Sequence, residues 1–281
     1  MSTTPADETH KHAAIEQWTA DPCGAEGIEE APGSRTYAEQ LLKARAEYAP
    51  WLADTFDYGG ARGLDVLDIG CGQGIDLMNY ALNGARAVGV DLTPRHVELA
   101  RAHLAAMGLG GEVVEGDAES LAFETSSFDR VSSNGVLHHT PDIDAALREA
   151  HRVLRPGGEA TIVLYNRRSA HYWVEQVLHE GLMRGKLLRE RSMEGVLSSG
   201  VEVSSIGARP LVRVYSPGQL RRKLRAAGFS QVGAEVRHFL PSDTFLTLAL
   251  HRRGLLNKRS TRDRIGRLVG WYVVGRGVRA A

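Results

Sequence analysis

The feature that most constrains the fold of this chain is a regular alternation of short aliphatic runs and helical stretches. Helices are predicted over 75–82, 94–107 and 142–154, and a glycine-containing turn follows each of them. Runs typical of buried strands lie before, between and after these helices, at 64–69, 87–90, 112–115, 128–133 and 160–164. Five strands that alternate with helices predict a parallel, doubly wound α/β sheet.

The pattern is less regular after residue 164. The remaining predicted elements are, in chain order, a helix over 170–190, an inserted loop over 192–212, a helix over 216–227, and strands over 229–239 and 271–274. The first of these helices would carry Trp173, Val177, Leu178 and Leu182 on one face. The segment 240–266 is left unassigned, because Phe245 to Leu250 could form a strand or a helix and the hydrophobic period does not decide between them.

Composition narrows the class of protein. Of the 281 residues 43% are hydrophobic, yet no apolar run approaches the ~20 residues of a membrane-spanning helix. The amino-terminal MSTTPADETHKH has no apolar signal core, and two cysteines are too few for a disulfide framework or a four-cysteine zinc site. We therefore expect a soluble, cytoplasmic protein.

Charge is balanced overall, with 34 basic and 34 acidic residues, but it is unevenly distributed. Residues 1–62 carry six more acids than bases, whereas residues 252–281 carry nine bases and one acid. The basic end either packs against the acidic amino-terminal segment or binds an anionic partner, and the sequence favours the first.

A glycine-rich turn follows the first predicted strand. Asp68-Ile-Gly70-Cys71-Gly72-Gln-Gly74 leads directly into a helix, at the edge where open α/β sheets bind ligands. Glycine lets the backbone turn sharply and approach a ligand without a Cβ in the way. A dinucleotide fingerprint requires Gly or Ala where this chain has Ile75, so the turn suits a ligand without a pyrophosphate.

Two more acids stand at the ends of successive predicted strands. Asp91 follows Asp68 by 23 residues, and a carboxylate there can accept hydrogen bonds from both ribose hydroxyls. Asp117 follows the third strand and can accept a hydrogen bond from an adenine amino group. One acid at a strand end is as often a helix cap, but three in register indicate a nucleoside site.

Five motifs in order resemble those of class I S-adenosylmethionine-dependent methyltransferases. They are VLDIGCGQGIDLM, VGVDLTP, GDAESLAF, SFDRVSSNGVLHHTPD and RVLRPGGEATIVLYN, and the resemblance covers residues 64–168. The similarity is strongest to a small-molecule subgroup that includes ubiquinone and menaquinone biosynthesis methyltransferases. The resemblance implies a Rossmann-like, mostly parallel seven-stranded sheet, whose antiparallel seventh strand would lie near 269–278. It also divides the chain into an amino-terminal helical lid, 1–62, and a methyltransferase domain, 63–281, with a substrate-side insertion at 170–214.

The resemblance further implies which residues hold the cofactor, S-adenosylmethionine. Asp91 would bind the ribose, Asp117 and Ala118 the adenine, and Leu92 would flank the adenine or pack in the core. The methionine part would lie against Asp68, Gly70, Cys71, Gly72, Gly74 and Asn134, and Asp68 would hold its amino group directly or through water.

The acceptor would enter from the loop after the fourth strand, which contains His138 and His139. Imidazole titrates near neutral pH, so one of them could take the acceptor's proton; alternatively, both orient the loop. Adjacent histidines without a cysteine or acid at ligand spacing are a poor zinc cage, so no metal is predicted.

Further predicted substrate-binding residues lie at the same edge and in the amino-terminal segment. Tyr165, Arg167 and His171 follow the fifth strand and could bind a polar acceptor, although the arginine could equally face solvent. Trp18 and Tyr37 belong either to a lid over the cofactor or to helices packed on the sheet edge.

The sequence predicts methyl transfer to an O, N or C nucleophile of a small molecule, in secondary metabolism or quinone-like biosynthesis. One alternative is an RNA or protein methyltransferase that uses the basic carboxyl-terminal region, although zero net charge makes a nucleic-acid partner the weaker choice. Another is a non-catalytic cofactor-binding partner protein. A homodimer is compatible with the sequence.

Overall fold

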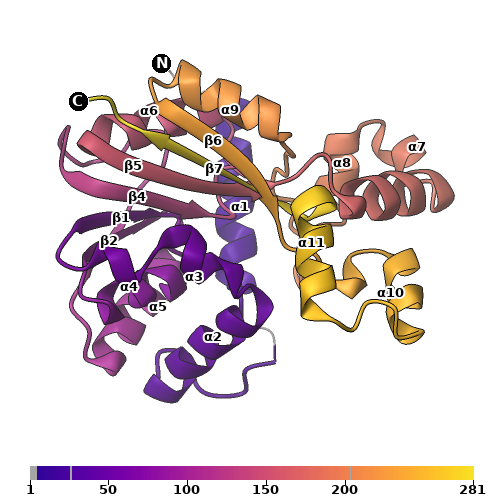
Figure 1. Ribbon diagram of the computed structural model, residues 1–281, viewed down its shortest axis with the longest axis horizontal. Helices are drawn as coiled ribbons and strands as arrows, with labels where there is room; N and C mark the ends of the chain where they lie inside the picture. Colours follow the sequence, from indigo (N-terminus) through magenta and orange to yellow (C-terminus); the bar gives the residue numbers. More distant parts are fainter. Residues whose placement is uncertain (1–4, 26, 203) are drawn as a thin grey trace.

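The computed structural model describes residues 5–25, 27–202 and 204–281, and a seven-stranded sheet forms its centre (Figure 1). The strands are β1 (Asp65–Ile69), β2 (Arg86–Asp91), β3 (Glu112–Glu115), β4 (Phe128–Asn134), β5 (Leu154–Tyr165), β6 (Ser230–Arg237) and β7 (Tyr272–Val278). Their order across the sheet is β3-β2-β1-β4-β5-β7-β6. The first five are parallel, and β7 runs antiparallel to both of its neighbours. The predicted fold is confirmed, including the antiparallel seventh strand.

Helices cover both faces of the sheet. One face packs on α2 (Arg35–Tyr48), α3 (Trp51–Phe56), α4 (Ile75–Leu82) and α5 (Pro94–Met107), and the other on α6 (Ile143–Val153) and α9 (Pro217–Ala226). Successive side chains of a strand point to opposite faces, so Ile162 and Leu164 of β5 join one core cluster and Val163 joins the other. A continuous apolar strand is therefore what a doubly covered sheet requires.

Local capping explains why several helices lie where the sequence placed them. The side chain of Asp142 accepts the N–H of Ala145 at the start of α6, and Ser216 forms a capping box with Gln219 at the start of α9. Thr93 occupies the expected cap position of α5, but its side chain makes no capping bond. Its backbone N–H is instead donated to Asp91.

The predicted start of the fifth strand is wrong. β5 begins at Leu154, which pairs with Phe128, and a register shift between Phe128 and Arg130 takes up the extra residues. The predicted Arg155–Gly158 turn is thus an irregular part of the strand itself.

The insertion after β5 is more structured than predicted. It contains a π-helix, η2 (His171–Met183), followed by α7 (Lys186–Glu190) and α8 (Met193–Ser198), the last within the expected loop. The predicted stripe Trp173, Leu178 and Leu182 is exposed, whereas η2 buries Gln176 and Glu180. The unassigned segment forms η3 (Pro241–Asp243), α10 (Phe245–Arg252) and α11 (Arg259–Val269).

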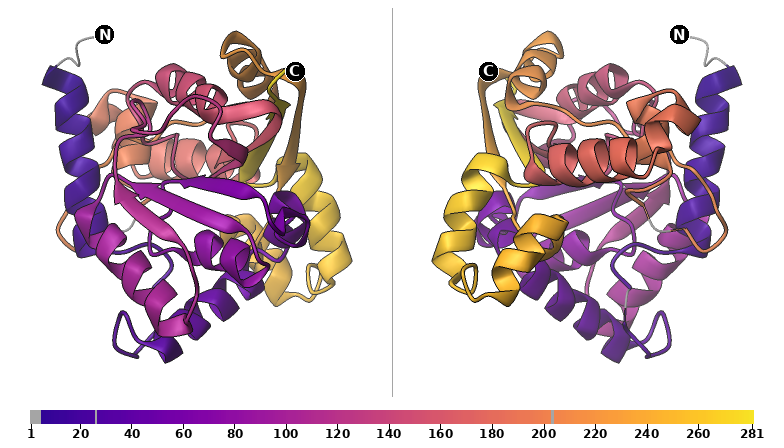
Figure 2. Two further views of the ribbon diagram at one scale, coloured as in Figure 1. Left: turned by 90° about the vertical axis from the view of Figure 1, so that its left-hand side faces the viewer. Right: turned by 90° about the vertical axis from the view of Figure 1, so that its right-hand side faces the viewer.

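The amino-terminal segment is helical. It begins with α1 (Pro5–Ala20), which lies beside α5 at the outside of the molecule (Figure 2). A short 3-10 helix, η1 (Gly59–Ala61), leads into β1. Part of the basic carboxyl-terminal end faces this acidic segment, because Arg262 and Arg267 line a surface pocket together with Glu47 and Asp54. Among the described residues, every helix is too short or too polar to cross a membrane.

Candidate functional site

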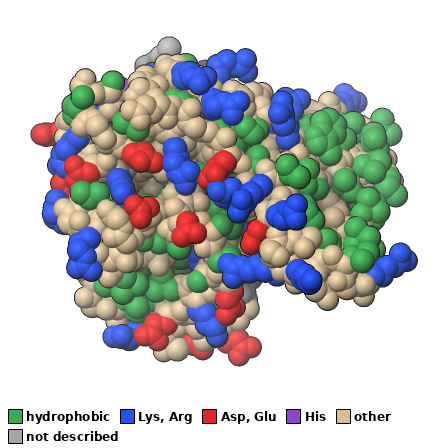
Figure 3. Space-filling view, viewed as in Figure 1, with side chains coloured by type: hydrophobic (Ala, Val, Ile, Leu, Met, Phe, Trp, Pro, Cys, Tyr) green, Lys and Arg blue, Asp and Glu red, His purple; other side chains and the backbone are tan. Residues whose placement is uncertain are grey.

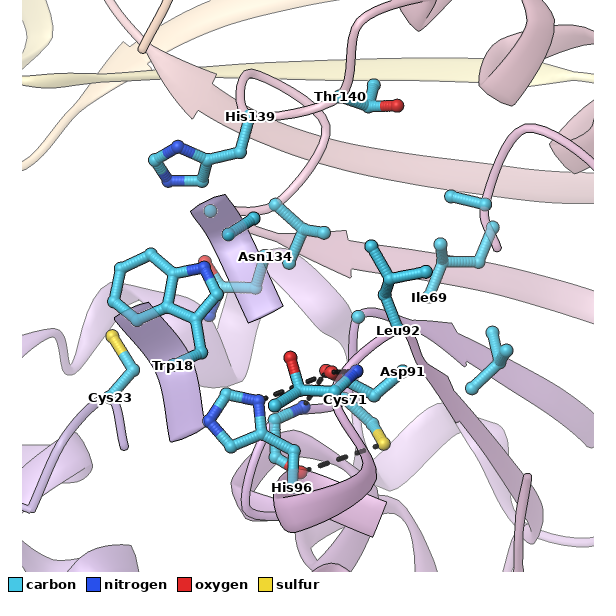
Figure 4. A pocket seen from close by; sticks show the side chains of 18 of the residues that line it. Trp18, Cys23, Ile69, Cys71, Asp91, Leu92, His96, Asn134, His139 and Thr140 are labelled. Atoms are coloured by element: carbon cyan, nitrogen blue, oxygen red, sulfur yellow. Dashed lines mark hydrogen bonds and ion pairs between the residues drawn. The ribbon is translucent and has the colours of Figure 1, made fainter. Parts of the chain in front are cut away.

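A cavity opens at the carboxyl ends of β1, β2 and β4, and α1 closes one side of it. Figure 4 shows Trp18, Cys23 and His139 on one side of this cavity, facing Asp91 and its neighbours on the other. Of the predicted site residues, those that line the cavity are Trp18, Gly70, Cys71, Gly72, Asp91, Leu92, Asp117, Ala118, Asn134, His139 and Tyr165.

The glycine turn has the backbone geometry that its sequence predicts. Gly70, Gly72 and Gly74 all have positive φ, at 71°, 54° and 85°, where side chains with a Cβ are strained. A Cβ on Gly70 would come within 2.4 Å of Val136, so glycine also allows the loop after β4 to approach. Gly74 faces Ala100 of α5 and lies outside the cavity, so it serves helix packing rather than contact with a ligand.

Asp91 is fixed by hydrogen bonds from three directions. One carboxylate oxygen accepts the Gly72 N–H at 2.8 Å, and the other accepts the Thr93 N–H at 2.9 Å and lies 3.3 Å from His96 Nδ1. Although the side chain is buried, these donors hold the pKa of Asp91 below its usual range, His96 being the strongest of them. A charged carboxylate therefore faces the cavity, and because three of its roughly four lone-pair positions are already used, about one is left for a ribose hydroxyl.

A second carboxylate in the cavity, Asp76, was not predicted. It accepts the Tyr58 hydroxyl at 2.7 Å and the Asn134 side-chain amide at 2.8 Å, and Arg45 lies 3.5 Å away. Asp68, which was predicted to hold the cofactor's amino group, lies behind this group and does not line the cavity. It is buried and accepts the Ser132 hydroxyl at 2.9 Å.

Burial and the nearby charge of Asp76 raise the pKa of Asp68 to about 8. A carboxyl in this position is protonated at neutral pH, even with Arg45 beside Asp76, until a further cation approaches the pair. Asp76 is thus the direct candidate for contact with a cationic ligand, and Asp68 acts behind it.

Asp117 meets a residue of the amino-terminal helix. Lys11 of α1 reaches Asp117 at 2.6 Å and Glu119 at 2.5 Å, and its side chain is largely buried there. The other oxygen of Asp117 accepts the N–H of Glu119 at 2.9 Å. The predicted adenine-binding carboxylate is therefore also the point at which α1 is attached to the site.

At the far end of the cavity, His139 faces a carboxylate from the insertion. Its Nδ1 lies 2.7 Å from the carbonyl oxygen of Leu211, and because a carbonyl only accepts, Nδ1 carries the proton. Nε2 then presents its lone pair, 3.6 Å from an oxygen of Glu202 that also accepts the Tyr165 hydroxyl at 2.7 Å. The edge of Trp18 packs on the imidazole.

His138 occupies a different environment from its neighbour. It is fully buried outside the cavity lining, its ring packs against Tyr165 with centroids 3.9 Å apart, and burial lowers its pKa well below the usual value. Potential ligand atoms of His138, His139 and Glu202 lie within 4.8 Å of one another. The carboxylate that the sequence lacked near the histidine pair is thus supplied by the insertion.

Three predicted substrate residues lie elsewhere. Tyr37 is buried under α5 and donates its hydroxyl to Gln73, Arg167 is exposed to solvent, and His171 packs on Trp271 outside the cavity. Burial lowers the pKa of His171.

Four charged residues of the cavity were not predicted from the sequence. Lys11, Arg45, Asp76 and Glu202 all line the cavity, and three of them come from outside the predicted sheet region. Only Asp76 had a local signal, because it opens the helix directly after the glycine turn. The others reach the cavity through tertiary packing, which spacing along the chain does not reveal.

The charges of the cavity fit the implied cofactor. Four carboxylates line it, from Asp76, Asp91, Asp117 and Glu202, against the two cationic groups of Lys11 and Arg45. S-adenosylmethionine carries a sulfonium, an ammonium and one carboxylate, so a net negative lining with one arginine complements it. Asp91 would hold its ribose, Asp76 its ammonium and Arg45 its carboxylate.

Part of this chain is similar to known methyltransferases. Residues 67–162 match the family described as "Methyltransferase domain". The ubiquinone biosynthesis O-methyltransferase of Xanthomonas oryzae pv. oryzae (strain PXO99A) is 33% identical over 156 residues, 55% of this chain. The match spans 63% of that relative, less than two thirds of its length.

Two solved structures show the same fold over most of the chain. A S-adenosylmethionine-dependent methyltransferase from Mesorhizobium loti is 22% identical with a TM-score of 0.53, covering 85% of this chain and all of its own. The [4+2]-cyclase SpnF is 19% identical with a TM-score of 0.53, covering 98% of this chain and 95% of its own. Residues 67–162 therefore carry a methyltransferase domain, and the glycine turn and strand-end carboxylates at the edge of its sheet are those expected of the class I S-adenosylmethionine-dependent family.

Proposed function

We propose that this protein transfers the methyl group of S-adenosylmethionine to a hydroxyl of a small, partly apolar acceptor. The observation that carries the proposal is a single cavity with Asp91 and Asp76 at one end and the Nε2 atom of His139 at the other. The similarity to the quinone-biosynthesis relatives covers only part of this chain and part of theirs. We therefore infer the acceptor from the cavity rather than from those relatives.

The chain's own residues have three tasks in this reaction. When bound, the cofactor supplies a methyl group on a sulfonium that is already activated for attack. Asp91, Asp76 and Arg45 would fix its orientation, and alignment of the reacting groups contributes ~7–11 kcal/mol in well-oriented cases. Trp18 and α1 would exclude water from the reacting centre.

His139 is the proposed general base. Its Nδ1 proton is held by the Leu211 carbonyl, so Nε2 is the atom that accepts the acceptor's proton. Glu202 would stabilise the imidazolium that forms, since one of its oxygens lies 3.6 Å from Nε2. His138 is not proposed as a base, because its ring is buried and does not line the cavity.

The acceptor end of the cavity favours a flat, hydroxyl-bearing molecule. Trp18, Tyr165 and Pro141 form its walls, and aromatic side chains bind flat rings well. A phenol would bring both an apolar ring and a removable proton. Secondary metabolism and quinone-like biosynthesis both supply such acceptors.

The test is incubation of the protein with methyl-labelled cofactor and a panel of phenols, amines, carboxylates, RNA and protein. We expect label on a phenol, lost in Asp91→Ala through cofactor binding and reduced about 100-fold in His139→Ala through kcat. If only RNA or protein became labelled, the small-molecule acceptor would be ruled out and a macromolecular acceptor identified instead. Cofactor binding without any transfer would identify a cofactor-binding partner protein instead, and sedimentation of the same sample would decide whether it is a dimer.

A further inference from the structure

The π-helix η2 exposes several large apolar side chains. A surface helix normally turns its apolar side inward. The helix buries Tyr172 in a core cluster together with Gln176 and Glu180, but Trp173, Leu182 and Met183 are 55%, 59% and 66% exposed. Exposing several large apolar side chains together is unfavourable in water, which indicates that this side faces something other than water.

A second helix beside η2 is equally exposed. None of the residues of α10 is buried, although the helix contains Phe245, Leu246 and Leu250. The two helices are in contact, because the Phe245 ring lies 5.4 Å from that of His179 and the Phe245 N–H is donated to Glu175. Of the described residues, most of the large exposed apolar side chains belong to these helices and to the residues just after them: Trp173, Leu178, Leu182, Met183, Leu188, Phe245, Leu246, Leu250 and Leu255. We call this set the apolar end.

Basic side chains border the apolar end. Figure 3 shows hydrophobic side chains gathered at the right-hand end of the molecule, with Lys and Arg at their border and no Asp or Glu among them on that face. From Phe245 to Arg262 the chain has no acid, and its bases are Arg252, Arg253, Lys258, Arg259 and Arg262. Arg252 and Arg253 directly follow the exposed turn of α10.

We propose that the apolar end binds the surface of a bilayer that contains anionic phospholipid. Apolar side chains bordered by arginine and lysine are the arrangement that lies in a membrane interface, with the rings and leucines among the acyl chains and the cations at the headgroups. In the described part of the chain every helix is too short or too polar to span the bilayer, so the proposed contact is with its surface.

Charge selects this occupant over a second copy of the chain. A self-complementary interface would bring the exposed arginines of two copies together, with no acid between Phe245 and Arg262 to pair with them. An anionic surface instead offers phosphates to the exposed Arg252, Arg253 and Lys258, whereas Arg259 and Arg262 line the pocket with Glu47 and Asp54.

The insertion connects this surface to the cavity. It supplies Glu202 to the acceptor end of the cavity and η2 to the apolar end. A lipid-soluble acceptor would therefore reach the cavity from the membrane, a consequence that rests on the proposed function, whereas membrane binding itself does not.

The experiment is co-flotation of the full chain with vesicles of phosphatidylcholine, with and without about one third phosphatidylglycerol. We expect flotation with the anionic vesicles, weakened by salt. The emission of Trp173 should shift to the blue, and Trp173→Phe should remove that shift. Leu188→Glu should abolish flotation, because Leu188 is 86% exposed and its replacement leaves the core intact.

Matched variants distinguish binding through the apolar end from non-specific adsorption to vesicles. Arg252→Ala with Arg253→Ala should weaken partitioning by about 25-fold, about fivefold for each charge. Leu82→Glu and Arg35→Ala, exposed residues outside the apolar end, should change nothing.

Three results would overturn the proposal. The first is a wild-type protein that stays with the soluble fraction under every vesicle composition. The second is a dimer that Leu188→Glu converts to a monomer, which would assign the apolar end to self-association. The third is salt-dependent binding to RNA that competes with the vesicles and is insensitive to Leu188→Glu.

Discussion

Glu202 and His139 form the contact on which the proposed proton transfer depends. Replacing Glu202 by Gln keeps the size of the side chain but removes the charge 3.6 Å from Nε2. We expect kcat with a phenolic acceptor to fall about tenfold, equivalent to ~1.4 kcal/mol, because the imidazolium loses its partner in a largely buried site. Cofactor affinity, measured by calorimetry, should stay unchanged.

Tyr165→Phe is the matched control for this variant. It removes the hydroxyl donated to Glu202 but keeps the ring stacked on Trp271. A change of less than about threefold in kcat is expected, since the carboxylate keeps its charge. Full activity of Glu202→Gln, or a loss that appears only in KM, would remove Glu202 from the proton transfer.

Asp68 makes cofactor binding depend on pH. Its pKa is raised to about 8, so the carboxyl is protonated at pH 7 in the ligand-free protein. A cationic group bound at Asp76 lowers that pKa and expels the proton, so affinity should rise with pH up to about 8 and then level off.

Calorimetry in buffers of different ionisation enthalpy measures the proton release directly. We expect release of up to one proton at pH 7 by the wild type and none by Asp68→Asn, in which Ser132 still has an acceptor. Equal proton release by both proteins would assign the titration to another group.

At the scale of elements, α1 is attached to the site by one buried lysine. Lys11 spans the space to Asp117 and Glu119, and charge-assisted hydrogen bonds of this kind are the stronger ones. We expect Lys11→Met to speed dissociation of the bound cofactor about tenfold in a stopped-flow experiment, because α1 then opens more often.

The control is Arg35→Ala, which breaks an exposed pair with Glu39 on α2 and should leave dissociation unchanged. Slower dissociation in Lys11→Met would mean that the lysine competes with the adenine for Asp117, and α1 would then not be a lid.

The elements also show how far a sequence predicts a structure. The bounds of α4 and α5 agree with those expected, because glycine, proline and the apolar period act within a few residues. The start of β5 was misplaced, since its pairing with β4 outweighs a local Pro-Gly-Gly signal. The outward side of η2 could not be foreseen, because an apolar stripe looks the same whether it meets a core or another surface.

The residues of the candidate site also fall into those that the local sequence pattern predicts and those that it does not. The residues at strand ends, such as Asp91 and Asp117, follow from the strand pattern, because parallel strands end at one edge. Lys11, Arg45 and Glu202 come from helices or loops whose docking depends on the whole fold. Tyr37 was expected either in a lid or in a helix packed on the sheet edge, and His171 was expected near the cavity because it follows the fifth strand; both are used in packing.

For the molecule as a whole, buried histidines set the response to acid. Burial lowers the pKa of His103, His138, His151, His171 and His238. His238 has a pKa of about 4 and joins two layers, because its Nδ1 accepts the Trp51 indole N–H at 3.1 Å. Below about pH 6.5 these histidines bind protons in the unfolded chain but not in the folded chain. Each of them therefore lowers the free energy of unfolding as the pH falls.

The free energy of unfolding, measured with urea, should be lower at pH 5 than at pH 7. The titration of His238 alone should lower this free energy by about 2 kcal/mol between the two pH values, and the loss should continue as the pH falls toward 4. Asp68 acts in the opposite direction, because its raised pKa favours the folded state at low pH. The comparison with His238→Gln isolates the histidine: the variant should be less stable at pH 7, yet lose about 2 kcal/mol less on acidification. If both proteins respond equally to pH, the charge of His238 is accommodated in the folded state and its burial does not control acid stability.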